Sequence, residues 1–378
     1  MEKRLGIYIH IPFCMQKCAY CDFYSITDIK RRASYAKALI EQIRSYRVSA
    51  KDYIVDSVYI GGGTPSLLFG EELAAILSAV RSTFRLSADA EISMEANPGT
   101  LDGEKLAAYH AAGVNRLSLG LQSADNGELK RLSRIHTREE FESSFLLARL
   151  EGFQNISVDL MYALPDQTTE RLSETISYVI SLNPEHISFY GLKIEPETPF
   201  GKDPKVQDAI PDEDAQYHMY LSAVKMLESA GYMQYEISNF AKPGHECRHN
   251  LKYWNCDEYL GFGTAAYSFF DGSMFSYVKD VELYRMNPTD RDLLLDEMNT
   301  PSKRDTATQY VMVRFRLRKG IDISEYNERF GDDFEKRYGE KLKPFLEGRF
   351  VVQTPEGYRL SRRGMLVSNY ILSEILEF

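Results

Sequence analysis

The sequence lacks the features that would place it in several specialised classes of protein. No apolar run approaches the roughly 18 residues that a membrane-spanning helix needs, and the mean hydropathy is −0.36. The start of the chain has no long apolar stretch followed by small residues, so we expect no secretory signal and a cytoplasmic protein. Hydrophobic residues make up 44% and charged residues 26%. This composition predicts a globular protein with a sizeable core rather than a disordered chain.

Basic residues are too few for a nucleic acid to be the main partner. The chain has 45 Lys and Arg against 55 Asp and Glu, a formal net charge of −10. Residues 301–378 are the exception, with 15 basic and 12 acidic side chains. We interpret this excess as an ordinary solvated surface and expect no nucleic-acid partner, with RNA binding by this segment as the alternative.

Cysteine is scarce, yet three of the five cysteines fall within eight residues. Cys14, Cys18 and Cys21 have the spacing C-x3-C-x2-C, whereas Cys247 and Cys256 lie far along the chain. An odd number of cysteines without a secretory signal disfavours a disulfide framework. Clustered thiols indicate metal ligation or redox chemistry instead. Iron–sulfur clusters usually take four cysteines, so three would leave one iron open, while a structural zinc site would need a second ligand pair that the spacing lacks.

Strand-like runs alternate with helical patterns six times in the first half of the chain. The predicted strands are Leu5–Phe13, Ser57–Ile60, Glu91–Ala96, Arg116–Gln122, Ile156–Leu164 and His186–Ile194. Apolar residues three and four positions apart predict helices at Tyr35–Tyr46, Glu71–Phe84, Leu101–Ala112, Arg138–Leu150 and Arg171–Ile180. The alternation predicts an α/β fold with a parallel sheet, and both an open sheet and a partial barrel fit it.

We expect three segments along the chain. Residues 1–210 would form the strand–helix domain, residues 211–287 would close it, and residues 288–378 would form a smaller α+β, winged-helix-like domain. The middle segment contains an irregular aromatic stretch, Tyr232–Tyr284. In the last segment, a hairpin is predicted at Phe350–Leu360, and helices are predicted at Asp290–Met298, Arg304–Leu317, Ile323–Phe330, Phe334–Glu347 and Arg363–Leu376.

The cysteine motif resembles that of the radical S-adenosylmethionine (SAM) superfamily. An aromatic residue, Tyr20, precedes the last of Cys14, Cys18 and Cys21, as in that superfamily. The resemblance implies a [4Fe–4S] cluster on these cysteines, whose open iron binds SAM and cleaves it reductively to a 5′-deoxyadenosyl radical. Gly61-Gly-Gly-Thr-Pro65 is similar to the superfamily's glycine motif, which lies against the methionine amino group of SAM. The implied fold is a partial (β/α)6 barrel.

Six segments resemble, in order, the oxygen-independent coproporphyrinogen III oxidase-like subfamily. They are Tyr8–Cys14, Gly61–Pro65, Glu95–Pro98, Gly120–Ser123, Leu132–His136 and Asp159–Pro165. Each lies at or just beyond the C-terminal end of a predicted strand, where parallel α/β folds bind ligands. The resemblance implies SAM contacts by Tyr8, Tyr20, Gly62, Gly63, Thr64, Glu95, Gln122, Arg134 and Asp159. The charges suit that ligand, because carboxylates accept from ribose hydroxyls or an ammonium and Arg134 pairs with a carboxylate.

Two features depart from the oxidase and resemble its sister group, the heme chaperones of the HemW type. Phe23 stands where the oxidase has a fourth cysteine. His249-Asn250-x-x-Tyr253-Trp254 resembles the H-N-x-x-Y-W signature of the heme chaperones and contains the only Trp of the chain. The resemblance implies a protein that carries a [4Fe–4S] cluster and SAM, binds heme and transfers it to an acceptor.

The implied partners are heme, an electron donor for the cluster and a heme-accepting protein, soluble or membrane-associated. The alternative function is radical oxidative decarboxylation of coproporphyrinogen III to protoporphyrinogen IX, an activity that we expect to be absent because of Phe23. His245, Cys247 and His249 would share one face of an extended segment, and both imidazole and thiolate bind heme iron. His249 is the candidate heme ligand, with Cys247 as a second, and the alternative is a polar loop packed on the barrel. Cys256 is expected to be a small buried hydrophobe.

Overall fold

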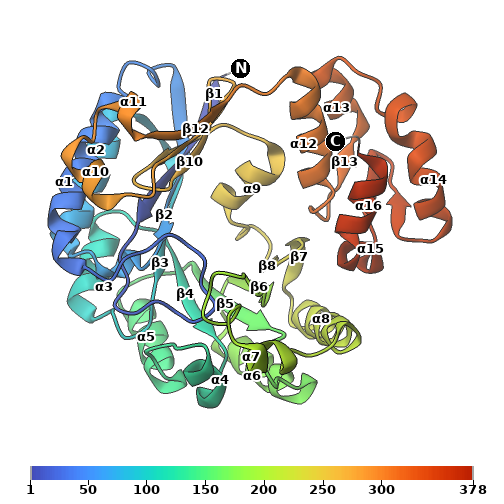
Figure 1. Ribbon diagram of the computed structural model, residues 1–378, viewed down its shortest axis with the longest axis horizontal. Helices are drawn as coiled ribbons and strands as arrows, with labels where there is room; N and C mark the ends of the chain where they lie inside the picture. The colour runs from blue at the N-terminus through green and yellow to red at the C-terminus, as the bar shows by residue number, and fades with distance from the viewer. Residues whose placement is uncertain (1, 377–378) are drawn as a thin grey trace.

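Strands β1 to β6 lie side by side in chain order, and each neighbouring pair is parallel, in a computed structural model that describes residues 2–376. The strands are β1 (Lys3–Ile11), β2 (Tyr53–Gly62), β3 (Arg85–Ala96), β4 (Arg116–Gln122), β5 (Ile156–Tyr162) and β6 (His186–Gly191). The intervening helices are α1 (Arg32–Ser45), α2 (Gly70–Thr83), α3 (Gly103–Ala111), α4 (Asn126–Arg131), α5 (Arg138–Leu150) and α6 (Thr169–Leu182). Figure 1 shows the sheet curving with these helices on its outer side. The α/β fold with a partial barrel is confirmed.

The two faces of the curved sheet differ in chemistry because side chains alternate along each strand. In β4, Leu117, Leu119 and Leu121 are fully buried in the core between sheet and helices. Arg116 and Ser118 point the other way and line a cavity on the concave side. The hydrophobic core therefore lies outside the barrel, and the barrel interior is polar.

The helices begin where the sequence offers capping residues. Thr137 accepts a hydrogen bond from the amide of Glu140, whose carboxylate accepts in return from the amide of Thr137 (2.8 Å). This reciprocal cap starts helix α5. Phe141, Phe145 and Ala148 of the helix then face the sheet at helical spacing, and all three are buried.

The region Tyr232–Tyr284 is regular, so the prediction of an irregular stretch was wrong. It contains β7 (Met233–Glu236), β8 (Asn239–Ala241), α9 (Arg248–Asn255), β9 (Tyr259–Phe262), β10 (Tyr267–Phe270), β11 (Ser273–Tyr277) and α10 (Val281–Met286). Its strands are three to five residues long. Short connections join β7 to β8, β9 to β10 and β10 to β11, whereas helix α9 lies between β8 and β9. Together with β12 (Leu295–Asn299), these strands extend the sheet at both edges to the order β12-β11-β10-β9-β1-β2-β3-β4-β5-β6-β8-β7.

Helix α9 lies on the concave side of the sheet, against β1 (Figure 1). Gly6 of β1 makes this approach possible: a Cβ atom there would lie 2.7 Å from Cδ of Lys252 and 3.1 Å from Cε1 of His249. Only glycine leaves room for a helix so close to the strand. The segment that carries the H-N-x-x-Y-W signature thus fills one end of the barrel interior.

The C-terminal elements form a separate small domain with its own core. They are α12 (Lys303–Arg314), β13 (Ile321–Asp322), α13 (Ile323–Phe330), the π-helix η3 (Glu335–Gly339), α14 (Glu340–Glu347), β14 (Val351–Gln353), β15 (Gly357–Leu360), α15 (Arg362–Leu366) and α16 (Ser368–Ile375). Strands β13, β15 and β14 form a three-stranded sheet, and the predicted hairpin is its β14–β15 part. The predicted final helix is two helices, because Val367 interrupts it.

The helix predicted at Asp290–Met298 was wrong in its second half. A short α11 (Arg291–Leu294) is followed by β12 (Leu295–Asn299), which pairs with β11 at the sheet edge. We therefore propose that the small domain begins after Asn299 rather than at residue 288. The remaining elements are α7 (Pro204–Asp208), α8 (Glu213–Ser229), η1 (Ile29–Arg31) and η2 (Pro65–Leu67). Among the described helices, none combines the length and apolarity needed to cross a bilayer.

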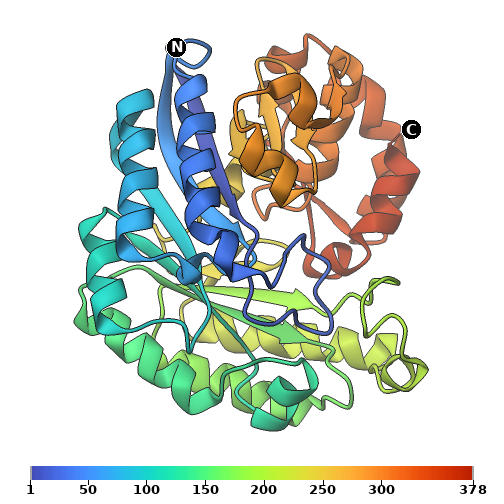
Figure 2. The ribbon, with the colours of Figure 1, turned by 60° about the vertical axis from the view of Figure 1, so that its left-hand side comes forward.

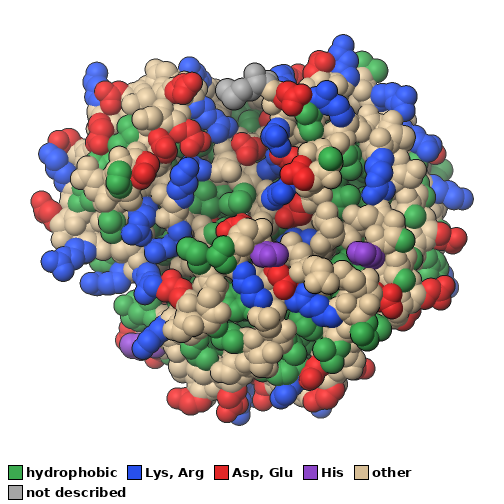
Figure 3. All heavy atoms as spheres, turned by 180° about the vertical axis from the view of Figure 1, so that it is seen from behind, with side chains coloured by type: hydrophobic (Ala, Val, Ile, Leu, Met, Phe, Trp, Pro, Cys, Tyr) green, Lys and Arg blue, Asp and Glu red, His purple; other side chains and the backbone are tan. Residues whose placement is uncertain are grey.

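Acidic and basic side chains are mixed on the outer surface. On the face shown in Figure 3, Lys and Arg alternate with Asp and Glu instead of gathering by sign. Among the described residues on this face, no extended basic track of the kind that binds a nucleic-acid backbone is seen.

Candidate functional site

The three clustered cysteines lie on the loop that follows β1. The loop is anchored at its start by the amide of Cys14, which donates to the carbonyl of Ile26 (3.0 Å). It is anchored again near its end by Ala19, which donates to the carbonyl of Leu132 and accepts from the amide of Phe200 (3.3 and 3.0 Å). Figure 2 shows this loop, in blue, between helix α1 and the green strands. The thiols are therefore held over the C-terminal ends of the parallel strands.

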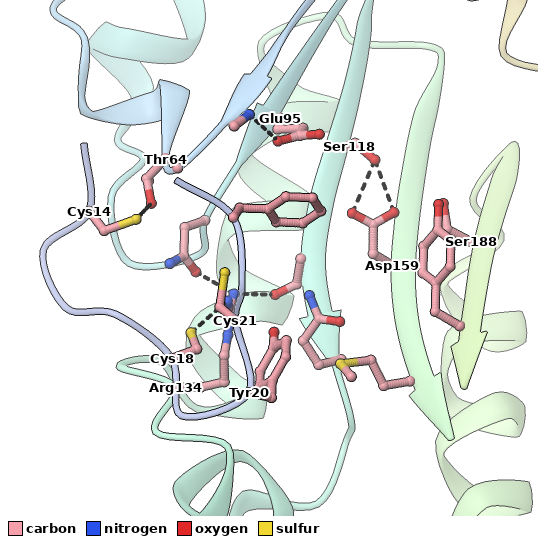
Figure 4. Close-up of a pocket in the computed structure, with 18 of the residues that line it drawn as sticks. Cys14, Cys18, Tyr20, Cys21, Thr64, Glu95, Ser118, Arg134, Asp159 and Ser188 are labelled. Carbon is pink, nitrogen blue, oxygen red and sulfur yellow. Dashed lines mark hydrogen bonds between the residues drawn. The ribbon is translucent and has the colours of Figure 1, made fainter. Parts of the chain in front are cut away.

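All three thiols are free and partly exposed, and two have hydrogen-bond donors beside them. Thr64 Oγ1 donates to Cys14 Sγ, and Arg134 Nη1 donates to Cys18 Sγ, each at 3.6 Å (Figure 4). Burial raises the pKa of Cys21, and the neighbouring Cys18 and Cys14 raise it further. A metal centre that binds these sulfurs must therefore displace protons, as metal sites on thiols generally do.

A cavity of about 530 Å³ opens beside the cysteines and extends into the barrel interior. Its volume is within the usual range of small-molecule sites, about 300 to 1,000 Å³. The predicted SAM residues that line it are Tyr20, Gly62, Gly63, Thr64, Glu95, Gln122, Arg134 and Asp159. Figure 4 shows Glu95, Ser118 and Asp159 on successive strands, facing the cysteine loop across this space.

Tyr8 is the one predicted SAM residue that does not line the cavity, as far as the described residues show. Its hydroxyl is hydrogen-bonded to Nδ1 of His10 (3.0 Å), and His10 Nε2 is hydrogen-bonded to the carbonyl of Tyr24 (3.0 Å). This chain connects β1 to the segment after the cysteine loop. In this structure Tyr8 supports the loop rather than facing the cavity.

The glycine motif after β2 lets the strand end pass directly beside the cysteine loop. Gly62 has φ +114°, which only glycine adopts readily. A Cβ atom on Gly63 would lie 2.7 Å from the carbonyl oxygen of Phe13 and 3.0 Å from that of Ile11. Any side chain at Gly63 would therefore push the loop away from the strand and displace the cysteines.

Two carboxylates lie on the inner wall, and burial raises the pKa of both. Burial raises the pKa of Glu95 to about 7, and the proximity of Asp159 adds to the shift. Glu95 accepts from the hydroxyl of Tyr59 (2.9 Å) and from the amide of Gly62 (3.1 Å). Asp159 accepts from Ser118 Oγ (3.0 Å), and burial raises its pKa as well. A bound cation or hydroxyl group would favour their charged forms.

Arg134 is fixed in position by neighbours on three elements. In addition to its contact with Cys18, its Nη2 donates to Asn97 Oδ1 (2.7 Å) and to the carbonyl of Gly120 (2.8 Å). Its guanidinium therefore lies between the cysteine loop and the strand ends, where it suits a ligand carboxylate beside the cluster position.

The sequence analysis missed several other residues that line the cavity. They are Tyr59, Asn97, Arg116, Ser118, Ser188, Tyr190 and Asn250. A signal for most of them was present, since polar residues alternate with aliphatic ones along β2, β4 and β6. Asn250 had no such signal, because its place in the wall depends on how α9 packs.

The H-N-x-x-Y-W segment is helical, so the prediction of an extended segment with His245, Cys247 and His249 on one face was wrong. His249 is fully buried, and its Nδ1 and Nε2 are hydrogen-bonded to Ser57 Oγ (3.0 Å) and the hydroxyl of Tyr253 (2.9 Å). Burial lowers the pKa of His249 to about 3. Neither ring nitrogen of His249 is available to heme iron in this arrangement.

Neither of the remaining cysteines faces the cavity. Cys247 is fully buried beside Glu91, and burial raises the pKa of its thiol to about 12. It therefore stays protonated at neutral pH and is a poor metal ligand. Cys256 belongs to the hydrophobic core of the C-terminal domain, as expected.

The residues at the cavity suit an iron–sulfur cluster with SAM beside it. Within residues 2–376, no three His, Cys, Asp or Glu side chains lie close enough to share a single metal ion. The thiolates of a cluster bind separate irons, so the three cysteines suit a cluster better than one ion. Arg134 for a carboxylate and Glu95 with Asp159 for an ammonium or ribose complete a donor set that matches SAM.

Comparison with known proteins shows similarity along nearly the whole chain. Residues 8–179 match the radical SAM superfamily, and residues 302–367 match the HemN C-terminal domain. Heme chaperone HemW of Escherichia coli is 36% identical, over 98% of both chains. Heme chaperone HemW of Bacillus subtilis is 32% identical, again over 98% of both. The chain belongs to the HemW family.

The fold of this HemW-family chain is also that of a solved oxidase. The structure of coproporphyrinogen III oxidase (HemN) from Escherichia coli, described as a radical SAM enzyme, superposes with a TM-score of 0.86. It covers 99% of this chain and 90% of the oxidase, with 24% sequence identity. At that identity the likeness shows a shared fold. Phe23, which follows the third cysteine, lies at the cavity and is 70% exposed.

Proposed function

We propose that this protein is a heme chaperone that binds heme and transfers it to an acceptor protein, and that it carries a [4Fe–4S] cluster and SAM. The observation that carries the proposal is the similarity to proteins named heme chaperone HemW, which extends over nearly the whole chain. The exposed Phe23 at the cavity supports it, because an apolar ring beside the opening suits a flat hydrophobic ligand.

In this proposal Cys14, Cys18 and Cys21 hold the cluster, and their loop separates it from solvent. The donors on Thr64 and Arg134 stabilise the bound thiolates, because hydrogen bonds to a charged acceptor favour the charged form. When bound, the cluster and SAM together supply one-electron redox chemistry.

The strand ends orient SAM. Arg134 takes the carboxylate, while Glu95 and Asp159 accept from the ammonium or from ribose hydroxyls. Gly62 and Gly63 line the cavity, and their lack of a side chain lets the end of β1 and the cysteine loop pass close beside them. An electron donor and a heme acceptor complete the set of partners. We propose the cytoplasm as the compartment, because free clustered thiols persist where the environment is reducing.

A heme titration of the anaerobically reconstituted protein tests the proposal, with coproporphyrinogen turnover measured on the same sample. We expect a saturable Soret band near one heme per chain, no turnover, and heme transfer to an apo heme protein. Conversion of coproporphyrinogen III to protoporphyrinogen IX would show an oxidase instead. Absence of both heme binding and turnover would overturn the proposal.

A further inference from the structure

Arg116, the first residue of β4, is a buried cation without a hydrogen bond or a close ion pair in the described residues, although Glu91 and Cys247 are among its electrostatic neighbours. Its side chain is 2% exposed, and its Nε is buried without a hydrogen bond. Within residues 2–376 the guanidinium forms no ion pair and no hydrogen bond. Buried charges in proteins are normally paired, because an unpaired charge loses its hydration without compensation. The arginine nevertheless lines the cavity.

A second side chain without a hydrogen bond lines the same cavity from a different element. Asn250 of α9 lines the cavity, and in the described part of the chain its carboxamide makes no hydrogen bond. The electrostatic neighbours of Arg116 include Cys247, which lies one helical turn before Asn250. Two N–H donor groups, one from β4 and one from α9, thus line the cavity without a hydrogen bond in the described part of the chain.

Among the described residues, the nearby carboxylates form no close ion pair with the guanidinium of Arg116. Glu91 accepts from the amides of Arg248 and His249 (3.2 and 3.3 Å), at the start of α9. Glu95 accepts from Tyr59 and Gly62, and Asp159 accepts from Ser118. Each carboxylate is engaged by other donors, and none is within ion-pair distance of Arg116 in the described residues.

We propose that Arg116 and Asn250 form a carboxylate-binding site in this cavity, and that its ligand is a propionate of heme. A planar guanidinium binds a carboxylate through two parallel hydrogen bonds. The single negative charge of a carboxylate matches the single positive charge of one arginine.

The carboxylate of SAM is not available to this site, because Arg134 holds the matching position beside Cys18 in the proposed function. The carboxylates left are those of heme, whose propionates extend on short flexible arms. The exposed ring of Phe23 would face the apolar macrocycle while one arm enters the barrel. The identity of the ligand rests on the proposed function. The observation that Arg116 and Asn250 make no side-chain hydrogen bond within residues 2–376 is independent of that function.

The test compares Fe(III) protoporphyrin IX with its dimethyl ester, in which both propionates are neutral. We expect Arg116→Gln to weaken heme binding tenfold or more and to leave binding of the dimethyl ester nearly unchanged. Arg116→Lys should retain part of the heme affinity, and Asn250→Ala should show the same selectivity with a smaller loss. Arg44→Gln, which removes an exposed arginine on α1, is the matched control.

The remaining outcomes separate this inference from the proposed function. Equal losses for heme and its dimethyl ester would mean that Arg116 only supports the fold, and would overturn the inference. Weakened SAM binding with unchanged heme binding, measured by calorimetry, would also overturn it. Unchanged binding of both ligands in Arg116→Gln would do the same. A wild-type protein that binds neither porphyrin would instead defeat the proposed function on which the ligand rests.

Discussion

The carboxylate of Glu91 accepts a hydrogen bond from the backbone amide of His249, with Oε1 and N 3.3 Å apart. Its second oxygen accepts from the amide of Arg248 (3.2 Å). Glu91 is on β3, so a strand residue caps the first turn of a helix that lies 157 residues later in the chain. The negative charge also complements the positive end of the helix dipole. This contact fixes α9, and with it Asn250, against the barrel interior.

Glu91→Gln should lower the free energy of unfolding by about 1 to 3 kcal/mol, because hydrogen bonds to a charged acceptor are lost or weakened. Urea unfolding followed by circular dichroism measures the change. Glu328→Gln, at an exposed position on α13, is the control and should behave as wild type. Equal stability of the two variants would show that Glu91 does not hold the helix.

Replacing Cys14, Cys18 or Cys21 by Ala should abolish the brown colour and the visible absorbance of the reconstituted protein. The reason is that each thiolate would bind a different iron of the cluster. Cys256→Ala is the control, since Cys256 packs in the C-terminal core and should leave the absorbance intact. A variant of the three that retains full cluster absorbance would show that its sulfur is not a ligand.

His249→Ala should destabilise the protein by about 2 to 4 kcal/mol, because it leaves a cavity and unpaired hydroxyl groups on Ser57 and Tyr253. The Soret maximum of any heme that still binds should match that of wild type, since both ring nitrogens are already hydrogen-bonded. Tyr253→Phe, which frees only Nε2, should also leave the maximum in place. A shifted Soret band in His249→Ala would establish His249 as an iron ligand.

The raised pKa of Glu95 predicts a pH-dependent stability difference between wild type and Glu95→Gln. The folded protein keeps the proton up to about pH 7, whereas the unfolded chain releases it near the ordinary value of 4.5. The stability of wild type relative to the variant should therefore fall as pH rises from about 4.5 to about 7. Urea titrations across this range test the sign.

Two controls apply to this pH series. The pKa of Glu236 is also raised to about 7 by burial, but Glu236 is present in both proteins and cancels in the difference. Glu104→Gln, an exposed change on α3, should give a curve parallel to that of wild type. If the stability of wild type relative to Glu95→Gln rose with pH, the pH dependence could not be assigned to the raised pKa of Glu95.

The single tryptophan reports the junction between the barrel and the small domain. The guanidinium of Arg316 lies 5.9 Å from the centre of the Trp254 ring. At the same junction Arg329 donates to the carbonyls of Asn255 and Cys256 at the end of α9 (2.8 and 2.6 Å). Arg329→Ala should shift the fluorescence transition to lower urea than the circular dichroism transition. Coincident transitions, as expected for the Glu328→Ala control on the same helix, would contradict a weakened junction.

The repeated strand–helix pattern predicted the barrel because its signals are local. Leu117, Leu119 and Leu121 alternate within one strand, and the Thr137–Glu140 cap marks a helix start within four residues. The site residues on strand ends followed from the same regularity, together with the family resemblance. Periodicity and capping act over short distances, so one sequence is enough to detect them.

The predictions that failed depend on contacts between distant residues. The alternation of His245, Cys247 and His249 suggested an extended segment, but Glu91 supplies the cap that makes it helical. The packing of α9 depends on Gly6, and nothing in the sequence around Gly6 indicates that it contacts Lys252 and His249 of α9. Tertiary contacts of this kind override local patterns and leave no local trace.

The pairing of β9 with β1 also determines when the site can exist during synthesis. The cysteines leave the ribosome early, but β1 remains an exposed edge until Tyr259–Phe262 pairs with Gly6–Ile9. Asn250 arrives only shortly before that. About two-thirds of the polypeptide must therefore emerge before the barrel interior is enclosed. A cluster bound to the three cysteines earlier than that would be unprotected, so assembly of the proposed centre should follow the emergence of β9.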